Sequence, residues 1–201
     1  FTLGVVQSRW KNTFFISNIH AKSGFFANAH GLEPRTVDME FHDRSDRDIN
    51  QPFQEVNHLK ALNTFQYQRG KMKFESGMGF QHNYRQEWSE YTSHYYMPAV
   101  FPDTIGFSAE LERQFEKHTY SGNAAYTYLI NDKLDVLAGI NLDYQHNSID
   151  GRGFIIPAFT HFTAGGFFLT KYAPWESTKL QMGVRYDHGL VGTEDVIPHT
   201  G

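Results

Sequence analysis

The chain of 201 residues contains no cysteine. Without thiols it forms neither a disulfide framework nor a thiolate metal site, which excludes the small disulfide-stabilised scaffolds but not an exported protein. The net charge is −4 at pH 7, so the chain has no basic field of the kind that nucleic-acid binding needs. We therefore expect no nucleic-acid partner.

Long apolar runs are missing as well. No stretch of about 18 apolar residues occurs, which excludes a transmembrane helix. The first six residues, Phe1-Thr-Leu-Gly-Val-Val, lack the regions of a signal peptide, and we interpret both ends as cut from a longer chain. A transmembrane β-barrel remains compatible with these absences, because only alternate residues of its strands meet lipid.

Aromatic residues, in contrast, are abundant, at 16% of the chain with 18 Phe and 11 Tyr. Such residues favour strands and membrane interfaces. Between residues 72 and 88 the even positions are largely apolar or aromatic, whereas the odd positions are polar or glycine. This period of two predicts a β-strand of about 17 residues, longer than the roughly 3–10 residues that strands of soluble domains usually have.

The same alternation recurs along the chain and predicts about eight strands in four hairpins. It is clear in 117–130, 134–147, 162–172 and 180–187, and weaker in 3–7, 14–26 and 59–67. Short turns are expected near 11–12, 69–71, 131–133 and 173–177, and long polar connections near 27–54, 89–116 and 148–160. Short turns that alternate with long loops are typical of outer-membrane barrels, whose periplasmic turns are short and whose extracellular loops are long.

Aromatic residues also gather at two levels of the predicted strands. Tyr126, Tyr128, Tyr172 and Trp175 lie near the short turns, and Tyr84, Trp88, Tyr144 and Phe162 lie toward the long loops. Two such bands are what the two membrane interfaces require. The sequence therefore predicts an all-β fold, a transmembrane antiparallel β-barrel in the outer membrane of a Gram-negative bacterium, with lipid as a partner.

Two alternatives fit the same alternation. A complete eight-stranded outer-membrane barrel, serving as an adhesin or a structural protein, needs no further strands. A soluble lipocalin-like barrel also has about eight alternating strands, but it turns its apolar face inward around a ligand. Its loops are usually shorter, and it has no need of two aromatic bands.

Several phrases of the sequence resemble the barrel of TonB-dependent receptors from Bacteroidetes-type bacteria. They are Gly24-Phe-Phe-Ala-Asn-Ala-His-Gly-Leu-Glu-Pro, Asp43-Arg-Ser-Asp-Arg-Asp-Ile, Pro52-Phe-Gln-Glu-Val-Asn-His, Gly79-Phe-Gln-His-Asn-Tyr-Arg-Gln-Glu, Leu111-Glu-Arg-Gln-Phe-Glu-Lys and Gln145-His-Asn-Ser-Ile-Asp-Gly-Arg-Gly-Phe-Ile-Ile-Pro. The resemblance implies a middle section of a 22-stranded barrel, without the family's N-terminal plug domain or its TonB-contacting segment. It further implies energised uptake of a large, scarce ligand, with an iron–siderophore chelate as the leading candidate. The plug and the TonB complex are then partners through the full-length protein.

Candidate ligand-binding residues come from two places. The polar face of 72–88, toward the long loops, contributes Gln81, Asn83 and Arg85, which would line the lumen of a large barrel. The second long connection carries an aromatic patch whose candidates for stacking on a planar ligand are Trp88, Tyr91, Tyr95 and Tyr96. Contacts to a plug and packing within the loop are the alternative roles of these two sets.

The first long connection places Asp38, Glu40 and His42 at alternate positions. In an extended segment they would share a face and offer oxygen and imidazole ligands to a cation. Arg44 and Arg47 stand among the neighbouring acidic residues, so a solvated network of charge pairs is the favoured interpretation and we predict no metal site. We also expect no catalytic residues, no cofactor and no enzymatic activity.

Overall fold

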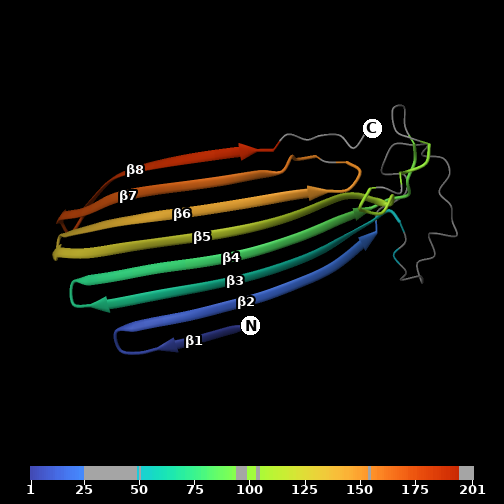
Figure 1. Cartoon of the computed structure of the whole chain (residues 1–201). Helices are drawn as coiled ribbons and strands as arrows, with labels where there is room; N and C mark the ends of the chain where they lie inside the picture. Colours follow the sequence, from blue (N-terminus) through green and yellow to red (C-terminus); the bar gives the residue numbers. More distant parts are fainter. Residues whose placement is uncertain (25–48, 50, 94–98, 103–104, 154, 195–201) are drawn as a thin grey trace.

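The computed structural model of the chain describes residues 1–24, 49, 51–93, 99–102, 105–153 and 155–194. These residues form a single antiparallel sheet of eight strands (Figure 1). The strands are β1 (Thr2–Val6), β2 (Trp10–Gly24), β3 (Phe53–Arg69), β4 (Met72–Trp88), β5 (Leu111–Asn131), β6 (Leu134–Asp150), β7 (Phe159–Trp175) and β8 (Thr178–Thr193). The predicted all-β class with about eight strands is confirmed.

The strands follow one another in chain order as an antiparallel meander, and the sheet is open. Strands β1 and β8 form its two edges, because each is paired on one side alone within the described residues. Figure 1 shows the tight turns at one end of the sheet and, at the other, the strand ends that the long connections join. We call these the turn end and the loop end.

Several strand boundaries differ from the expected ones, most of them because the strands are longer than the alternation predicted. The first turn lies at residues 7–9 rather than at 11–12, and Lys11 and Asn12 pair with Val6 and Val5 inside the first hairpin. Asn12 interrupts the apolar positions of β2 and therefore looked like a turn residue. Strand β5 begins at Leu111, six residues before the expected start, because its first residues are polar on both sides although they are paired.

The two faces of the sheet differ in polarity. We call them the apolar face and the polar face, after the side chains that β4 places on each. The apolar face carries Met72, Phe74, Met78 and Phe80, and the polar face carries Lys73, Glu75, Gln81, Asn83, Arg85 and Glu87. Residues opposite each other in the register share a face, so the same two faces can be followed across all eight strands, although the polar face also carries single apolar residues such as Leu62 and Phe167.

A second layer that would cover the apolar face is absent from the described part of the chain. Large apolar side chains there are exposed, for example Met78 (70%), Met182 (73%) and Tyr186 (72%). The buried apolar residues are Leu111 and Ala158 alone among those described. A soluble domain packs such a face against another layer to form its core, so this sheet needs an apolar partner outside the described residues.

A row of aromatic side chains crosses the apolar face and ends its apolar part on the side of the loop end. Phe80, Tyr120, Tyr144 and Phe162 are register partners on β4 to β7. The ring centroids of Phe80 and Tyr120 lie 5.2 Å apart, and those of Tyr120 and Tyr144 lie 6.3 Å apart. We call these four residues the aromatic row. Beyond it, toward the loop end, the apolar face turns polar.

The turns are regularly staggered along the sheet. One register row runs through Trp10, Tyr67, Phe74, Tyr126, Ala138, Phe168 and Val184. Strands β2, β4, β6 and β8 start at Trp10, Met72, Leu134 and Thr178, so they begin 0, 2, 4 and 6 residues before this row. The stagger is thus one residue per strand. A strand rises about 3.3 Å per residue, and neighbouring strands lie about 4.8 Å apart. If a line is drawn through the successive turns, the strands are therefore tilted by about 35° from the direction perpendicular to that line.

Glycine has a defined role at two turns of the described chain. Gly70 and Gly151 have positive φ angles of 56° and 95°, in the β3–β4 turn and just after β6. Residues with a side chain rarely adopt such angles.

In the described residues no helix combines the length and the apolar character that crossing a membrane would take.

Candidate functional site

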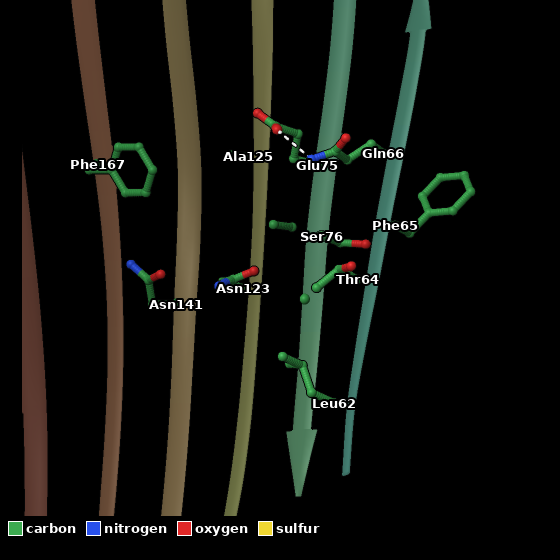
Figure 2. A pocket seen from close by; sticks show the side chains of 12 residues that line it. Leu62, Thr64, Phe65, Gln66, Glu75, Ser76, Asn123, Ala125, Asn141 and Phe167 are labelled. Atoms are coloured by element: carbon green, nitrogen blue, oxygen red, sulfur yellow. Dashed lines mark hydrogen bonds between the residues drawn. The ribbon is translucent and has the colours of Figure 1, made fainter. Parts of the chain in front are cut away.

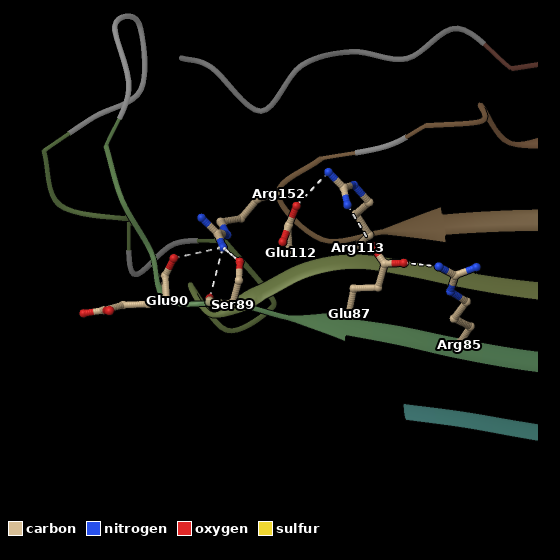
Figure 3. Close-up of polar contacts among 7 residues, drawn as sticks. All are labelled: Arg85, Glu87, Ser89, Glu90, Glu112, Arg113 and Arg152. Atoms are coloured by element: carbon tan, nitrogen blue, oxygen red, sulfur yellow. Dashed lines mark hydrogen bonds and ion pairs between the residues drawn. The ribbon is translucent and has the colours of Figure 1, made fainter. Parts of the chain in front are cut away.

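Charged side chains converge where β4 and β5 reach the loop end (Figure 3). Glu87 accepts a hydrogen bond from Nη1 of Arg113 at 2.8 Å and another from Nη2 of Arg85. Glu87 is buried, with 7% of its surface exposed, whereas the Arg85 side chain is 41% exposed. Arg113 also pairs with Glu112 at 2.7 Å. A buried carboxylate therefore links two strands through two guanidinium groups.

Two opposing effects act on the pKa of Glu87. Burial of the carboxylate by itself raises the pKa, but the hydrogen bonds from Arg113 and Arg85 and their positive charges lower it by more. The net result is a pKa below the ordinary value of a glutamate. Glu87 is therefore ionised at neutral pH and holds both arginines in place.

Arg152, from the connection between β6 and β7, extends this network to the neighbouring loop. Its Nη2 donates to the carbonyl oxygen of Ser89 at 3.1 Å, to Oγ of Ser89 at 2.7 Å and to the carbonyl oxygen of Glu90 at 3.4 Å. Its guanidinium lies 5.3 Å from the ring centroid of Tyr91. Burial lowers the pKa of Arg152, and the nearby Glu112 opposes that effect. The side chain joins residues 151–153 to the start of the 89–110 connection.

Some side-chain nitrogen atoms of this cluster do not form a hydrogen bond. The Nε atoms of Arg85, Arg113 and Arg152 are buried and have no hydrogen-bond partner among the described residues. Buried donors nearly always have a partner. The Arg85 guanidinium, whose side chain is 41% exposed, is the cationic donor at the loop end of the polar face that a carboxylate, a hydroxamate or another oxygen-rich anion fits chemically.

Apart from Tyr91, the residues predicted from the sequence fall into three groups. Gln81, Asn83 and Arg85 follow one another on the polar face of β4 and lead up to the buried Glu87. Trp88 lies opposite Phe53 in the register and stacks on it at 6.1 Å, which places it on the other face. Tyr95, Tyr96, Asp38, Glu40 and His42 lie outside the described residues.

Tyr91 contacts residues of its own connection. Its ring meets the ring of Phe101 edge-on at a centroid distance of 5.4 Å, and Phe101 packs at 5.7 Å against Phe107. With Arg152 over its ring, Tyr91 connects this aromatic cluster to the charged one. The structure thus brings Arg85 and Tyr91 to the same end of the sheet, whereas Trp88 lies on the opposite face.

The sequence patterns missed Arg113 and Arg152. Arg113 stands in a stretch whose alternation is lost, and its approach to Glu87 depends on the pairing of β4 with β5. Arg152 lies 63 residues from Ser89 in the chain, so its contacts result from the meander and not from local spacing. The single local indication was the Arg85-x-Glu87 spacing, which places both side chains on one face of a strand.

A shallow hollow lies on the polar face nearer the turn end (Figure 2). Its volume is about 420 Å³, and Thr64, Gln66, Glu75, Asn123, Asn141 and Phe167 are among its lining residues. Nε2 of Gln66 donates to Glu75 at 3.3 Å across it. Gly77 helps to keep it open, since a Cβ at that position would lie 2.9 Å from Oδ1 of Asn123. Its exposed lining is largely apolar, with contributions from Leu62 and Phe167, and Glu75 is the one charged residue among those that line it.

Comparison of the chain with protein-family models, with curated proteins and with solved structures finds no match in any of the three.

Proposed function

We propose that this chain is a section of the wall of an outer-membrane β-barrel, with the apolar face toward lipid and the polar face toward the lumen. The observation that carries the proposal is the exposed apolar face, which extends over every strand of a single-layered sheet. In water such a face would drive aggregation, whereas in a bilayer it is solvated by acyl chains.

The height of the apolar face supports this assignment. On β6 the apolar positions run from Leu134 to Tyr144, and on β7 from Phe162 to Tyr172, which is 11 residues on each strand. Eleven residues at about 3.3 Å, inclined by about 35°, span about 27 Å along the membrane normal. The apolar band of outer-membrane barrels is about 25 Å tall, and their strands are inclined by about 35–45°.

The connections support an orientation. All tight turns lie at one end of the sheet, and the strand ends that the long connections 25–52, 89–110 and 151–158 join lie at the other. In outer-membrane barrels the short turns are periplasmic and the long loops extracellular. The charged cluster of Arg85, Glu87 and Arg113 is then at the extracellular end of the lumen wall.

We propose further that the whole protein is a TonB-dependent receptor that imports a large, scarce ligand, with an iron–siderophore chelate as the leading candidate. Supporting this are the resemblance of residues 24–60, 79–116 and 145–157 to such receptors and the open sheet. Within the described residues β1 and β8 are each paired on one side alone, and a bilayer does not tolerate such unpaired edges. Further strands on both sides would complete a wide barrel of the 22-stranded class, which has room for a plug.

In such a barrel the ligand would meet the polar face at its extracellular end. Gln81, Asn83 and Arg85 are the lumen-facing candidates, and Tyr91 in the adjoining connection is the aromatic candidate within the described residues. Arg85 suits this role because its exposed side chain faces the lumen while Glu87 fixes its orientation. The uptake itself requires a plug domain and the TonB complex as partners.

The first test is the intact mass of the native protein, isolated from its source membrane with detergent. A mass several times the 23.2 kDa of this chain agrees with a wide barrel. A mass near 23.2 kDa would instead identify a small eight-stranded barrel that is too narrow for import, and extraction without detergent would identify a soluble lipocalin-like barrel.

The second test addresses the ligand. We expect the receptor to bind a panel of ferric siderophores and to support growth under iron limitation, and Arg85→Gln to weaken binding by at least tenfold. Lys73→Gln is the matched control, because Lys73 lies on the same face of the same strand at the turn end. Equal binding by wild type and Arg85→Gln, or an equal loss in the control, would contradict this placement of the site.

A further inference from the structure

Just beyond the aromatic row, the apolar face carries a row of histidines. His82 on β4, His118 on β5 and His146 on β6 are successive register partners. Each lies two residues past its aromatic neighbour, which is Phe80, Tyr120 or Tyr144 respectively. A strand places residues two apart on the same face, so the three imidazoles stand side by side at the upper border of the apolar band.

Glu116 completes a compact group with two of them. It lies two residues from His118 on the same face and diagonally opposite His82. Nε2 of His82 is 2.9 Å from Oε1 of Glu116, and Nε2 of His118 is 3.9 Å from the same oxygen. The rings of His82 and His118 stack with centroids 4.5 Å apart and planes at 15°. Both imidazoles thus point a ring nitrogen at one carboxylate oxygen.

We propose that His82, Glu116 and His118 form a binding site for a divalent transition-metal ion of the Zn²⁺ class. One ligand atom from each residue lies within 4.8 Å of the other two, and this is the one such group found among the described residues. Neighbouring ligand atoms in a tetrahedral zinc site are about 3.3 Å apart, given zinc–nitrogen bonds of about 2.0–2.1 Å. Small rotations of the side chains are enough to reach that spacing.

The donor set selects the class of ion. Two imidazoles and one carboxylate suit Zn²⁺, Cu²⁺ or Ni²⁺ better than Mg²⁺ or Ca²⁺, which prefer oxygen ligands alone. Three protein ligands leave a fourth position open for water or another group, as in zinc sites with two histidines and a glutamate. His146, next in the row, is a further imidazole on the same face.

The surroundings suit a bound cation. The side chains of His82, Glu116 and His118 are 31%, 38% and 32% exposed, so an ion can reach them from solvent. Phe80 and Tyr120 lie directly below, and the ring of Phe80 is 6.2 Å from that of His118. An ion held here would tie β4 to β5 where the apolar face ends. The site is defined by the sheet alone, so the inference does not depend on the proposed transport function.

The test is a zinc titration of the full-length protein, purified in detergent and freed of metal with a chelator. A chromophoric zinc indicator competes with the protein for the added zinc and reports how much the protein binds. We expect the wild type to bind one zinc ion more per chain than His118→Gln, and Glu116→Gln to weaken that site by at least tenfold. His188→Gln should bind like the wild type. His188 is the matched control because it lies on the same face, on β8, opposite Ala164 rather than another potential ligand.

A second measurement keeps the proposal testable if a variant fails to fold. Co²⁺ added to the wild-type protein should produce the visible absorption bands of tetrahedral cobalt, and Zn²⁺ should abolish them. Equal zinc binding by wild type and His118→Gln would overturn the site, leaving His82 and Glu116 as a simple ion pair. Absence of the tetrahedral cobalt bands from the wild type would overturn it independently.

Discussion

The two ends of the same eight strands are built differently. Toward the turn end the sheet has one apolar and one polar face, and on β6 the apolar positions include Ile140, Leu142 and Tyr144. Toward the loop end polar residues occupy both faces beside single apolar ones such as Trp88, and β6 continues on the same side with His146 and Ser148. The pairing of the strands is unbroken between these parts, so the backbone alone does not distinguish them. The side chains differ instead: those of the turn-end part suit contact with lipid on one face, and those of the loop-end part suit contact with water on both.

The largest expected effect comes from a charge placed in the apolar band. Ile140 is 55% exposed and lies about midway along the band on β6. We expect Ile140→Lys to destabilise the folded protein in lipid vesicles by about 2–4 kcal/mol, as for lysine near the midplane of a bilayer. Ser148→Lys, on the same face of the same strand, should cost less than about 1 kcal/mol. Denaturant titrations measure both, and equal effects would remove the membrane boundary that we place between them.

The next effect is the loss of the buried carboxylate at the loop end. Glu87→Gln removes the charge that holds Arg85 and Arg113, and we expect it to cost about 2 kcal/mol, as for hydrogen bonds between charged groups. Glu75→Gln, on the same face of β4, breaks an exposed pair with Lys73 at 2.9 Å and should cost about 0–1 kcal/mol. Free energies of unfolding of the two variants test this order. A larger loss from Glu75→Gln would show that burial does not set the strength of these pairs.

The contribution of Glu87 should also depend on pH. Its pKa is lower in the folded protein than in the unfolded chain, so the folded state binds its proton less readily. The stability that the carboxylate provides is therefore complete above the ordinary glutamate pKa of about 4.3 and is lost as the pH falls through the lower folded value. We expect the difference in unfolding free energy between wild type and Glu87→Gln to shrink over that interval. A difference that is constant with pH would mean that Glu87 acts through its shape and not its charge.

The pattern of alternation predicted much of the fold, and the same comparison shows why it failed elsewhere. Alternation identifies a strand as long as its two faces differ, as they do from Tyr120 to Ile130. From Leu111 to Glu116 both faces are largely polar, so the alternation did not predict this part of the strand although its pairing continues. The candidate site suffered more, since Glu87 meets Arg113, and Ser89 meets Arg152, only after strands far apart in the sequence have paired. Arg85 was found because its position on the polar face is a local property.

A smaller effect distinguishes the two faces within the turn-end part. On the polar face, Gly139 lies under Phe167, and a Cβ there would meet Cζ of Phe167 at 2.4 Å and the carbonyl oxygen of Ala124 at 2.8 Å. We expect Gly139→Ala to destabilise the protein by about 1.5 kcal/mol through overpacking. Gly122, on the apolar face, has open space at the same position, so Gly122→Ala should change stability by less than about 0.5 kcal/mol. Equal costs of the two substitutions would contradict the close packing of Phe167 over Gly139.

The smallest effect should be confined to the loop end. Arg152→Ala removes the side-chain link to Ser89, but the backbone bonds from Arg152 N to Leu111 O and from Gly153 N to Glu112 O remain, so the global cost should be about 1 kcal/mol. Local opening nevertheless becomes easier, because Ser89 loses its partner across the connection. Hydrogen exchange should accelerate at the Ser89 amide, which donates to Glu110, and stay unchanged at the Leu129 amide, which donates to Lys71 at the turn end. Equal acceleration at both amides would mean that the two ends unfold as one unit, and the boundary between them would then be one of polarity alone.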